Sequence, residues 1–228
     1  MLTRSSRNPI IRPSRNAWES RKTYNPAAIY ENGIYHLFYR TTSKDWKSYI
    51  GHAVSKDGER FRRFSKPLIS PQYIWEEKGC EDPRITKIGD TFFLSYAALG
   101  RTAPNGRKAP RVAVAVSKDL RHWKKYGISF MHWNFYKAGG FLTWKRDPKK
   151  EKISPEWSKA AGIFPEKIGG KYWMLFGDTN IWLARSTDGH RWTPIRRPLL
   201  RARGRGYFDA HFVENGPAPI RTQEGWLV

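Results

Sequence analysis

The chain carries an internal repeat, and a repeat constrains the fold more strongly than any other feature of a sequence. Three segments share the pattern A-x-S-x-D with an aromatic residue a few positions later: HAVSKDGERF (52–61), VAVSKDLRHW (114–123) and LARSTDGHRW (183–192). Their serines lie 62 residues apart (55 to 117) and 69 residues apart (117 to 186). The fold must therefore be built from at least three similar units.

A second matching piece precedes each A-x-S-x-D segment. It is a glycine turn followed by an aromatic-rich stretch of alternating polarity: ENGIYHLFYR (31–40), IGDTFFLSYA (88–97) and IGGKYWMLFG (168–177). Alternation predicts strands, and no helical periodicity extends beyond about ten residues. A four-stranded unit of roughly 60 residues that recurs in this way predicts an all-β propeller. Asp57, Asp119 and Asp188 end the A-x-S-x-D pattern of their units. They are expected to cap the hairpin turns between the last two strands of each unit.

The last unit is incomplete in this chain. From Pro198 to Val228 it contains 31 residues, which is about half a period. We therefore expect a propeller of which about three and a half blades are present, in one incomplete domain over residues 1–228. A protein with five blades of this period would be roughly 100 residues longer.

Asp82, in the sequence E-D-P-R, departs from the repeat. Aligned by the proline that follows, its counterparts in the other units are Asn25 and Phe164. Equivalent positions in successive blades surround the central axis, so these loops are expected to converge and to form a site there. The alternative is a surface Asp-Pro turn with an Asp–Arg pair.

The net charge of +22 raises the question of a polyanionic partner. The basic residues are spread from Arg4 to Arg221, without a basic helix or zinc-finger spacing, which favours a solvated basic surface over a specific nucleic-acid site. The histidines are scattered, so we expect no metal. The single cysteine, Cys80, permits a reducing compartment, and no signal-peptide or membrane-spanning stretch is evident. We expect a cytoplasmic protein without a membrane partner, and the oligomeric state stays open.

The motifs, taken in order, resemble glycoside hydrolase family 130. The matching segments are YNPAAIYENGIYHLFYR (24–40), SYIGHAVSKDG (48–58), CEDPRITKIGD (80–90), KAAGIFPEKIGGKYWMLFGD (159–178) and FDAHFVENGPAPIRTQEGW (208–226). Members of that family are five-bladed propellers that act on β-mannosides, mostly as inverting phosphorylases and in fewer cases as hydrolases. The resemblance implies inverting cleavage of β-mannosidic bonds in an oligosaccharide substrate, without a cofactor.

The resemblance makes Asp82 the general acid, which donates its proton to the glycosidic oxygen through a hydroxyl of the bound sugar. Glu81 beside it and burial near the axis would raise the pKa of a carboxyl group there. Pro83 would fix the backbone, and Arg84 would orient the acid. Asn25 and Arg40 resemble binders of the mannosyl hydroxyls, although an arginine at a strand end is ordinarily solvated or ion-paired.

The attacking species distinguishes two reactions. A phosphorylase uses inorganic phosphate, which needs cations, whereas a hydrolase needs a carboxylate to activate water. Lys159 resembles the family's phosphate ligand, although Ala160 stands where an acid or amide often follows, and a solvated loop lysine is the alternative. Asp178 stands where many phosphorylases carry a basic pair.

Two carboxylates near the end of the chain complete the candidate site. Glu214 is the candidate base if the enzyme hydrolyses, and Asp209 resembles a sugar-binding carboxylate; a strand-end hydrogen bond is the alternative for both. Lys159 and the basic field favour phosphorolysis with phosphate as co-substrate. A non-catalytic propeller module that binds carbohydrate or an anionic polymer is the alternative function.

Overall fold

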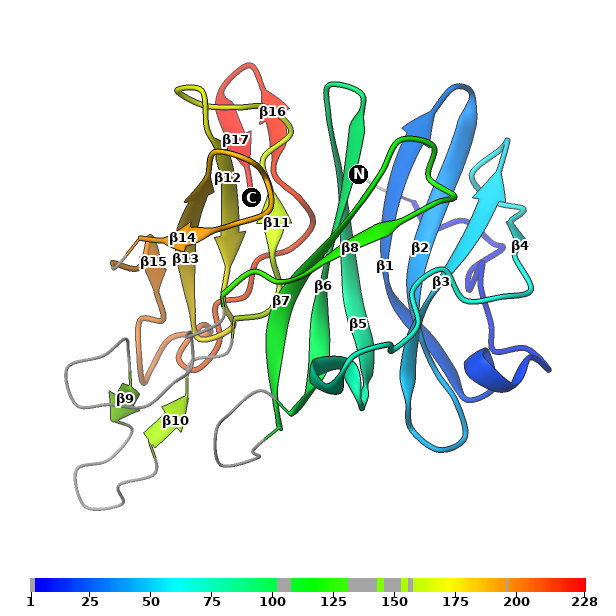
Figure 1. The fold of residues 1–228 in the computed structure, drawn as a ribbon, viewed down its shortest axis with the longest axis horizontal. Helices are drawn as coiled ribbons and strands as arrows, with labels where there is room; N and C mark the ends of the chain where they lie inside the picture. The colour runs from blue at the N-terminus through cyan, green and yellow to red at the C-terminus, as the bar shows by residue number, and fades with distance from the viewer. Residues whose placement is uncertain (1–2, 102–107, 131–142, 146–152, 156–157, 196) are drawn as a thin grey trace.

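The computed structural model describes the whole chain except residues 1–2, 102–107, 131–142, 146–152, 156–157 and 196 (Figure 1). Its strands form three four-stranded antiparallel units. The first is β1 (Lys22–Glu31), β2 (Ile34–Thr42), β3 (Ser48–Ser55) and β4 (Arg62–Arg63); the second is β5 (Gly79–Ile88), β6 (Thr91–Arg101), β7 (Lys108–Ser117) and β8 (Lys124–Ile128); the third is β11 (Gly162–Ile163), β12 (Tyr172–Phe176), β13 (Asn180–Ser186) and β14 (Thr193–Pro194). The predicted four-stranded repeat is confirmed.

The remaining elements are short. They are the 3-10 helices η1 (Ala17–Glu19) and η2 (Ile74–Glu76), the β9 (Thr143–Lys145) and β10 (Ile153–Pro155) pair, β15 (Leu200–Arg201), which pairs with β13, and the β16 (Ile220–Thr222) and β17 (Gly225–Leu227) hairpin. In Figure 1 the three units stand side by side in chain order, and a single parallel pair, Ser48 with Gly79, joins the first to the second. None of the helices in the described ranges is long and apolar enough to cross a membrane.

The core lies between neighbouring units because alternate residues of each aromatic strand face opposite sides. On β6, Phe92 and Leu94 pack against the first unit, whereas Phe93 packs against the third, where Trp182 and Phe176 are also buried. Burial of such side chains contributes about 1.5–3 kcal/mol each, so face-to-face packing of the sheets is the main source of stability.

The A-x-S-x-D motifs form hairpin turns, as predicted. The Asp57 carboxylate accepts hydrogen bonds from the backbone N–H groups of Glu59 and Arg60 and from the Ser55 hydroxyl. These hydrogen bonds lower the pKa of Asp57 to about 2. Asp119 and Asp188 make the same contacts in the next two units, which shows that all three acids cap turns as predicted.

Two buried acids repeat in a way that the sequence analysis missed. Glu19 in η1 accepts a hydrogen bond from the Tyr39 hydroxyl at 3.0 Å, and Glu76 in η2 accepts one from Tyr96 at 2.6 Å. Each acid also pairs with a cation of the fourth strand: Arg63 for Glu19 and Lys125 for Glu76. The signal was present as A-W-E and I-W-E, each a short distance before its unit.

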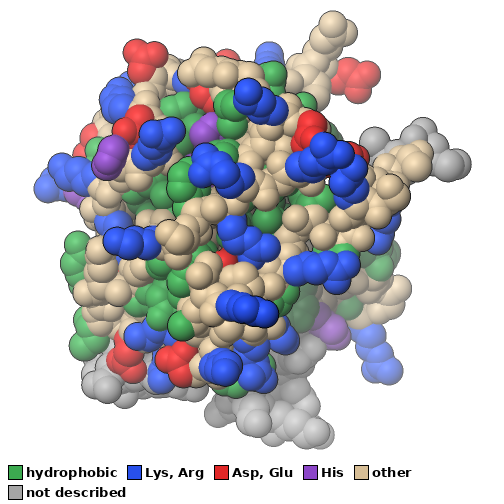
Figure 2. All heavy atoms as spheres, turned by 90° about the vertical axis from the view of Figure 1, so that its right-hand side faces the viewer, with side chains coloured by type: hydrophobic (Ala, Val, Ile, Leu, Met, Phe, Trp, Pro, Cys, Tyr) green, Lys and Arg blue, Asp and Glu red, His purple; other side chains and the backbone are tan. Residues whose placement is uncertain are grey.

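Lys and Arg side chains are spread over the face formed by the first unit, with acids between them (Figure 2). On this face the basic side chains are scattered among other side chains and do not gather in one patch.

The alignment of Phe164 with Asn25 and Asp82 is wrong. Asn25 and Asp82 each lie at a β-bulge with a left-handed backbone, φ 46° and 52°. In the third unit the left-handed residue is Ala160, φ 55°.

The pairing register supports the same correction. The residue three positions later pairs with the equivalent position of the aromatic strand in every unit: Ala28 with Leu37, Ile85 with Leu94, and Ile163 with Met174. Phe164 is instead a core residue that packs edge-on against Trp226. The proline misled the alignment because the third unit has its proline later in the strand.

Candidate active site

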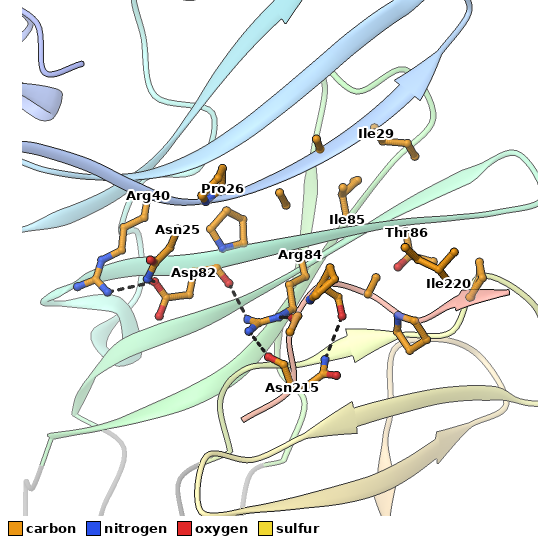
Figure 3. Close-up of a pocket in the computed structure, with 18 of the residues that line it drawn as sticks. Asn25, Pro26, Ile29, Arg40, Asp82, Arg84, Ile85, Thr86, Asn215 and Ile220 are labelled. Carbon is orange, nitrogen blue, oxygen red and sulfur yellow. Dashed lines mark hydrogen bonds and ion pairs between the residues drawn. The ribbon is translucent and has the colours of Figure 1, made fainter. Parts of the chain in front are cut away.

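The bulges of the first strands open onto one cavity near the centre of the structure. It has a volume of about 860 Å³, and β1 and β5 form one side of it (Figure 3). The 214–220 segment forms the other side. Six of the predicted site residues line it: Asn25, Arg40, Asp82, Arg84, Lys159 and Glu214. The structure therefore brings together side chains from all three units and from the segment that follows them.

Asp82 is held by two donors from the first unit. Asn25 Nδ2 donates to Asp82 Oδ1 at 2.7 Å, and Arg40 Nη1 donates to the same oxygen at 3.1 Å (Figure 3). Both contacts end on Oδ1, and within the described residues no hydrogen bond reaches Oδ2. The carboxyl group is thus oriented through one oxygen, and the other is available to a ligand.

Glu81 supports this arrangement through its contact with Arg40. Its Oε1 accepts hydrogen bonds from Arg40 Nη2 at 2.6 Å and from the Ser48 hydroxyl at 2.8 Å. Burial raises the pKa of Glu81, while Arg40 and Ser48 act in the opposite direction. Arg40 therefore connects the two adjacent acids, which fixes the position of one relative to the other.

The prediction that Arg84 orients Asp82 is wrong. The Arg84 guanidinium donates to the backbone carbonyl oxygens of Asn215 and Gly216, and it reaches only the backbone carbonyl of Asp82, at 3.4 Å. The bulge between Glu81 and Arg84 shifts the register, so the arginine side chain points across the cavity to the 214–220 segment (Figure 3). Arg84 thus fastens that segment to the second unit.

Lys159 also lines the cavity, and its neighbours there are acidic side chains. Its Nζ is 3.2 Å from Glu214 Oε1 and 3.9 Å from Asp178 Oδ2. It directly precedes the left-handed residue Ala160, so it occupies the position that Glu81 has in the second unit. A cation thus stands at the equivalent place of the next unit, facing the same cavity.

Two predicted site residues do not line the cavity: Glu81, which contacts it only through Arg40, and Asp209, which lies elsewhere. Both of its oxygens accept from Arg203 Nε, at 2.9 and 3.0 Å, and the Arg203 guanidinium stacks over the Tyr207 and Phe208 rings. Asp209 does not line the cavity.

Sequence reasoning missed Asn215 and Ser48, which act through a backbone carbonyl and a hydroxyl. Neither type of contact leaves a signal in a single sequence.

No group of three or more His, Cys, Asp or Glu side chains suited to a metal occurs within the described residues. Cys80 is buried, as expected for a packing residue, and burial raises its pKa. The cavity is therefore a site of carboxylates, amides and cations, which suits a polar neutral ligand.

The sequence pattern of the β-1,4-mannooligosaccharide phosphorylase family matches residues 3–228. The chain belongs to glycoside hydrolase family 130. It is 34% identical, over its whole length and 70% of the relative, to a 1,2-β-oligomannan phosphorylase of Thermoanaerobacter sp. (strain X514). It is 32% identical, with the same coverage, to a β-1,2-mannobiose phosphorylase of that strain. The chain is thus shorter than these relatives.

Solved structures agree with this family. A glycosyl hydrolase from Bacteroides ovatus superimposes with a TM-score of 0.79 at 29% identity, covering 98% of this chain and 67% of the other. A solved GH130 structure, described with the statement that this family of mannoside phosphorylases contains glycoside hydrolases that target β-1,2-mannosidic linkages in Candida mannan, gives a TM-score of 0.79 at 28% identity, with the same coverage. The predicted all-β propeller fold is confirmed, and the family consists of glycoside-processing enzymes.

Proposed function

We propose that this protein cleaves β-mannosidic bonds in manno-oligosaccharides with inversion, that Asp82 is the general acid, and that inorganic phosphate attacks the anomeric carbon. The observation that carries the proposal is the convergence of Asn25, Arg40 and Asp82 on one cavity. The phosphorylase activity named for the two Thermoanaerobacter relatives supports it.

Asp82 acts as the acid because of how it is held. Its Oδ1 accepts hydrogen bonds from Asn25 and Arg40, so Oδ2 is the oxygen that would carry the proton to the ligand. The proton passes to the glycosidic oxygen through a hydroxyl of the bound sugar. The Arg40 guanidinium then stabilises the carboxylate that forms, as an opposite charge within hydrogen-bond distance does.

Phosphate attacks from the face of the sugar opposite the leaving oxygen. One bond forms between a phosphate oxygen and the anomeric carbon, and the glycosidic carbon–oxygen bond breaks as the leaving oxygen takes the proton from Asp82. The products are mannose 1-phosphate with inverted configuration and the shortened oligosaccharide. Lys159 supplies a cation for the phosphate on its side of the cavity.

Hydrolysis is the competing reaction, because the GH130 family also contains glycoside hydrolases. Glu214 would then activate water, since it is a carboxylate that lines the same cavity. The two reactions differ in their requirement for phosphate.

The test is incubation with β-1,2- and β-1,4-mannobiose, with and without phosphate. Mannose 1-phosphate that forms only with phosphate supports phosphorolysis, and equal free mannose in both samples would exclude it. Asp82→Asn should lose about 10²–10⁴-fold in kcat. Asp90→Asn, an exposed turn residue, is the matched control and should keep wild-type activity. Full activity of Asp82→Asn would remove the acid assignment.

A further inference from the structure

We propose that the Glu214 carboxylate is an internal competitor for the phosphate site at Lys159, and that phosphate binds only when Glu214 leaves the lysine. This inference rests on the proposed phosphorolysis. It assigns Glu214 a role in setting phosphate affinity, distinct from the base that hydrolysis would need.

The first observation is the geometry around Lys159. Its ammonium contacts two carboxylates, Glu214 at 3.2 Å and Asp178 at 3.9 Å. The Asp178 side chain is nearly buried, 6% exposed, whereas that of Glu214 is 40% exposed. Glu214 is therefore the nearer of the two acids and the one with open space to move into.

The second observation is the charge of the cavity. The described cations that line it are Arg40, Arg84, Lys87 and Lys159, together with the carboxylates Asp82 and Glu214. Two further carboxylates, Glu81 and Asp178, pair with these cations from outside the lining. Lys87 is paired with Glu31 at 2.5 Å. Arg40 is already paired with Glu81 and Asp82, and Arg84 donates to backbone carbonyls. Lys159 is then the described cation best placed for phosphate, and its nearest contact is an acid.

Phosphate beside an unmoved Glu214 would place two anions within about 4 Å of each other. Like charges at that separation repel, and more strongly in a partly buried site than in water. Anions such as phosphate bind where cations and N–H donors are free to contact them. Phosphate must therefore replace Glu214 at Lys159.

The backbone around Glu214 is fixed while its side chain is exposed. Arg84 holds the carbonyl groups of the two following residues, Asn215 and Gly216 (Figure 3). Within the described residues the Glu214 side chain has Lys159 as its one ion-pair partner. Rotation about side-chain bonds is enough to release Lys159, so the exchange needs no movement of the segment.

The test is Glu214→Gln, which keeps the shape and removes the charge. We expect the KM for phosphate and the Kd of inorganic phosphate, measured calorimetrically without sugar, to fall about fivefold, the factor that an ion pair of this exposure supports. Glu224→Gln, which removes an exposed acid in the turn between β16 and β17, is the control and should keep wild-type values.

An unchanged or raised phosphate Kd in Glu214→Gln would overturn the inference, and so would no phosphate binding by either protein. A general-base role would not tighten phosphate binding, so the Kd separates the two roles. If Glu214→Gln does not fold, Glu214→Ser provides the same charge change at a half-exposed position. If the wild type forms no mannose 1-phosphate, the proposed function fails, while tighter phosphate binding by the variant would still support the exchange at Lys159.

Discussion

The Arg40 guanidinium bonds to both acids of the Glu81–Asp82 pair: Nη2 lies 2.6 Å from Glu81 Oε1 and Nη1 lies 3.1 Å from Asp82 Oδ1. One arginine of the first unit thus sets the geometry of Asp82, the proposed general acid, in the second. Two parallel donors at fixed spacing are a property of arginine that lysine does not have.

Arg40→Lys should therefore keep the charge and lose the geometry. We expect kcat to fall about 10–100-fold, because small misplacement of a catalytic group has effects of this size. Steady-state kinetics with mannobiose would measure it, and Arg60→Lys, at an exposed turn, is the control. Wild-type kcat in Arg40→Lys would mean that Asn25 alone orients Asp82.

Much of the fold and part of the site could be predicted from the sequence. Alternation along residues 31–40 and 88–97 predicted strands, which the structure places at 34–42 and 91–101, because the two faces of such a strand have different surroundings. Convergence of Asn25, Arg40 and Asp82 followed from the repeat and the family motifs. The partner of Arg84 could not be predicted, because a bulge changes the direction of the next side chain. The position of Asp209 was predicted wrongly, because nothing in the sequence indicates that Arg203 is its partner.

Arg84→Lys tests the link between the second unit and the 214–220 segment. One ammonium group cannot replace the donors that reach both Asn215 and Gly216. We expect the free energy of unfolding in urea to fall by about 1–3 kcal/mol, since the Asn215 and Gly216 carbonyl groups lose hydrogen bonds from a charged donor. Proteolysis in the 214–220 segment should become faster. Unchanged stability and cleavage would show that other contacts hold the segment.

Tyr96→Phe tests the repeated buried acids. Glu76 is fully buried, and removal of the Tyr96 hydroxyl takes away a donor at 2.6 Å. A buried carboxylate that loses a donor costs about 1–3 kcal/mol, and Tyr39→Phe should behave alike at Glu19. Thermal and urea unfolding would measure the loss. Tyr30→Phe, at a residue that is 58% exposed, should change stability by less than about 0.5 kcal/mol.

Ala160→Gly tests the left-handed backbone of the third unit. At φ 55° the alanine Cβ is strained by about 1–2 kcal/mol, which glycine avoids. Glycine has more conformational freedom than alanine in the unfolded chain, which offsets part of this gain. We therefore expect a net stabilisation of about 0.5–1 kcal/mol. The adjacent Ala161→Gly, where φ is negative, should instead destabilise the protein. Equal destabilisation by both variants would contradict the strain argument.

His52 makes stability depend on pH. Its ring is buried between Phe38 and Phe64, with ring centroids 4.8 and 4.9 Å away. Burial, together with the nearby His36 and Arg121, lowers the pKa of His52 from 6.5 to about 3. The unfolded chain therefore binds a proton at this residue between pH 6.5 and about 3, while the folded chain does not.

Stability should consequently fall as pH is lowered through this window, by up to about 1.4 kcal/mol per pH unit from this residue. The loss begins near pH 6.5, before most carboxylates titrate, and is measured by urea unfolding between pH 7 and 5. Burial also lowers the pKa of His36, so a variant is needed to separate the two histidines. His52→Phe keeps the aromatic packing and removes the titrating group, and its stability should change less over the same range. An identical pH slope in both proteins would show that His52 is protonated in the folded state.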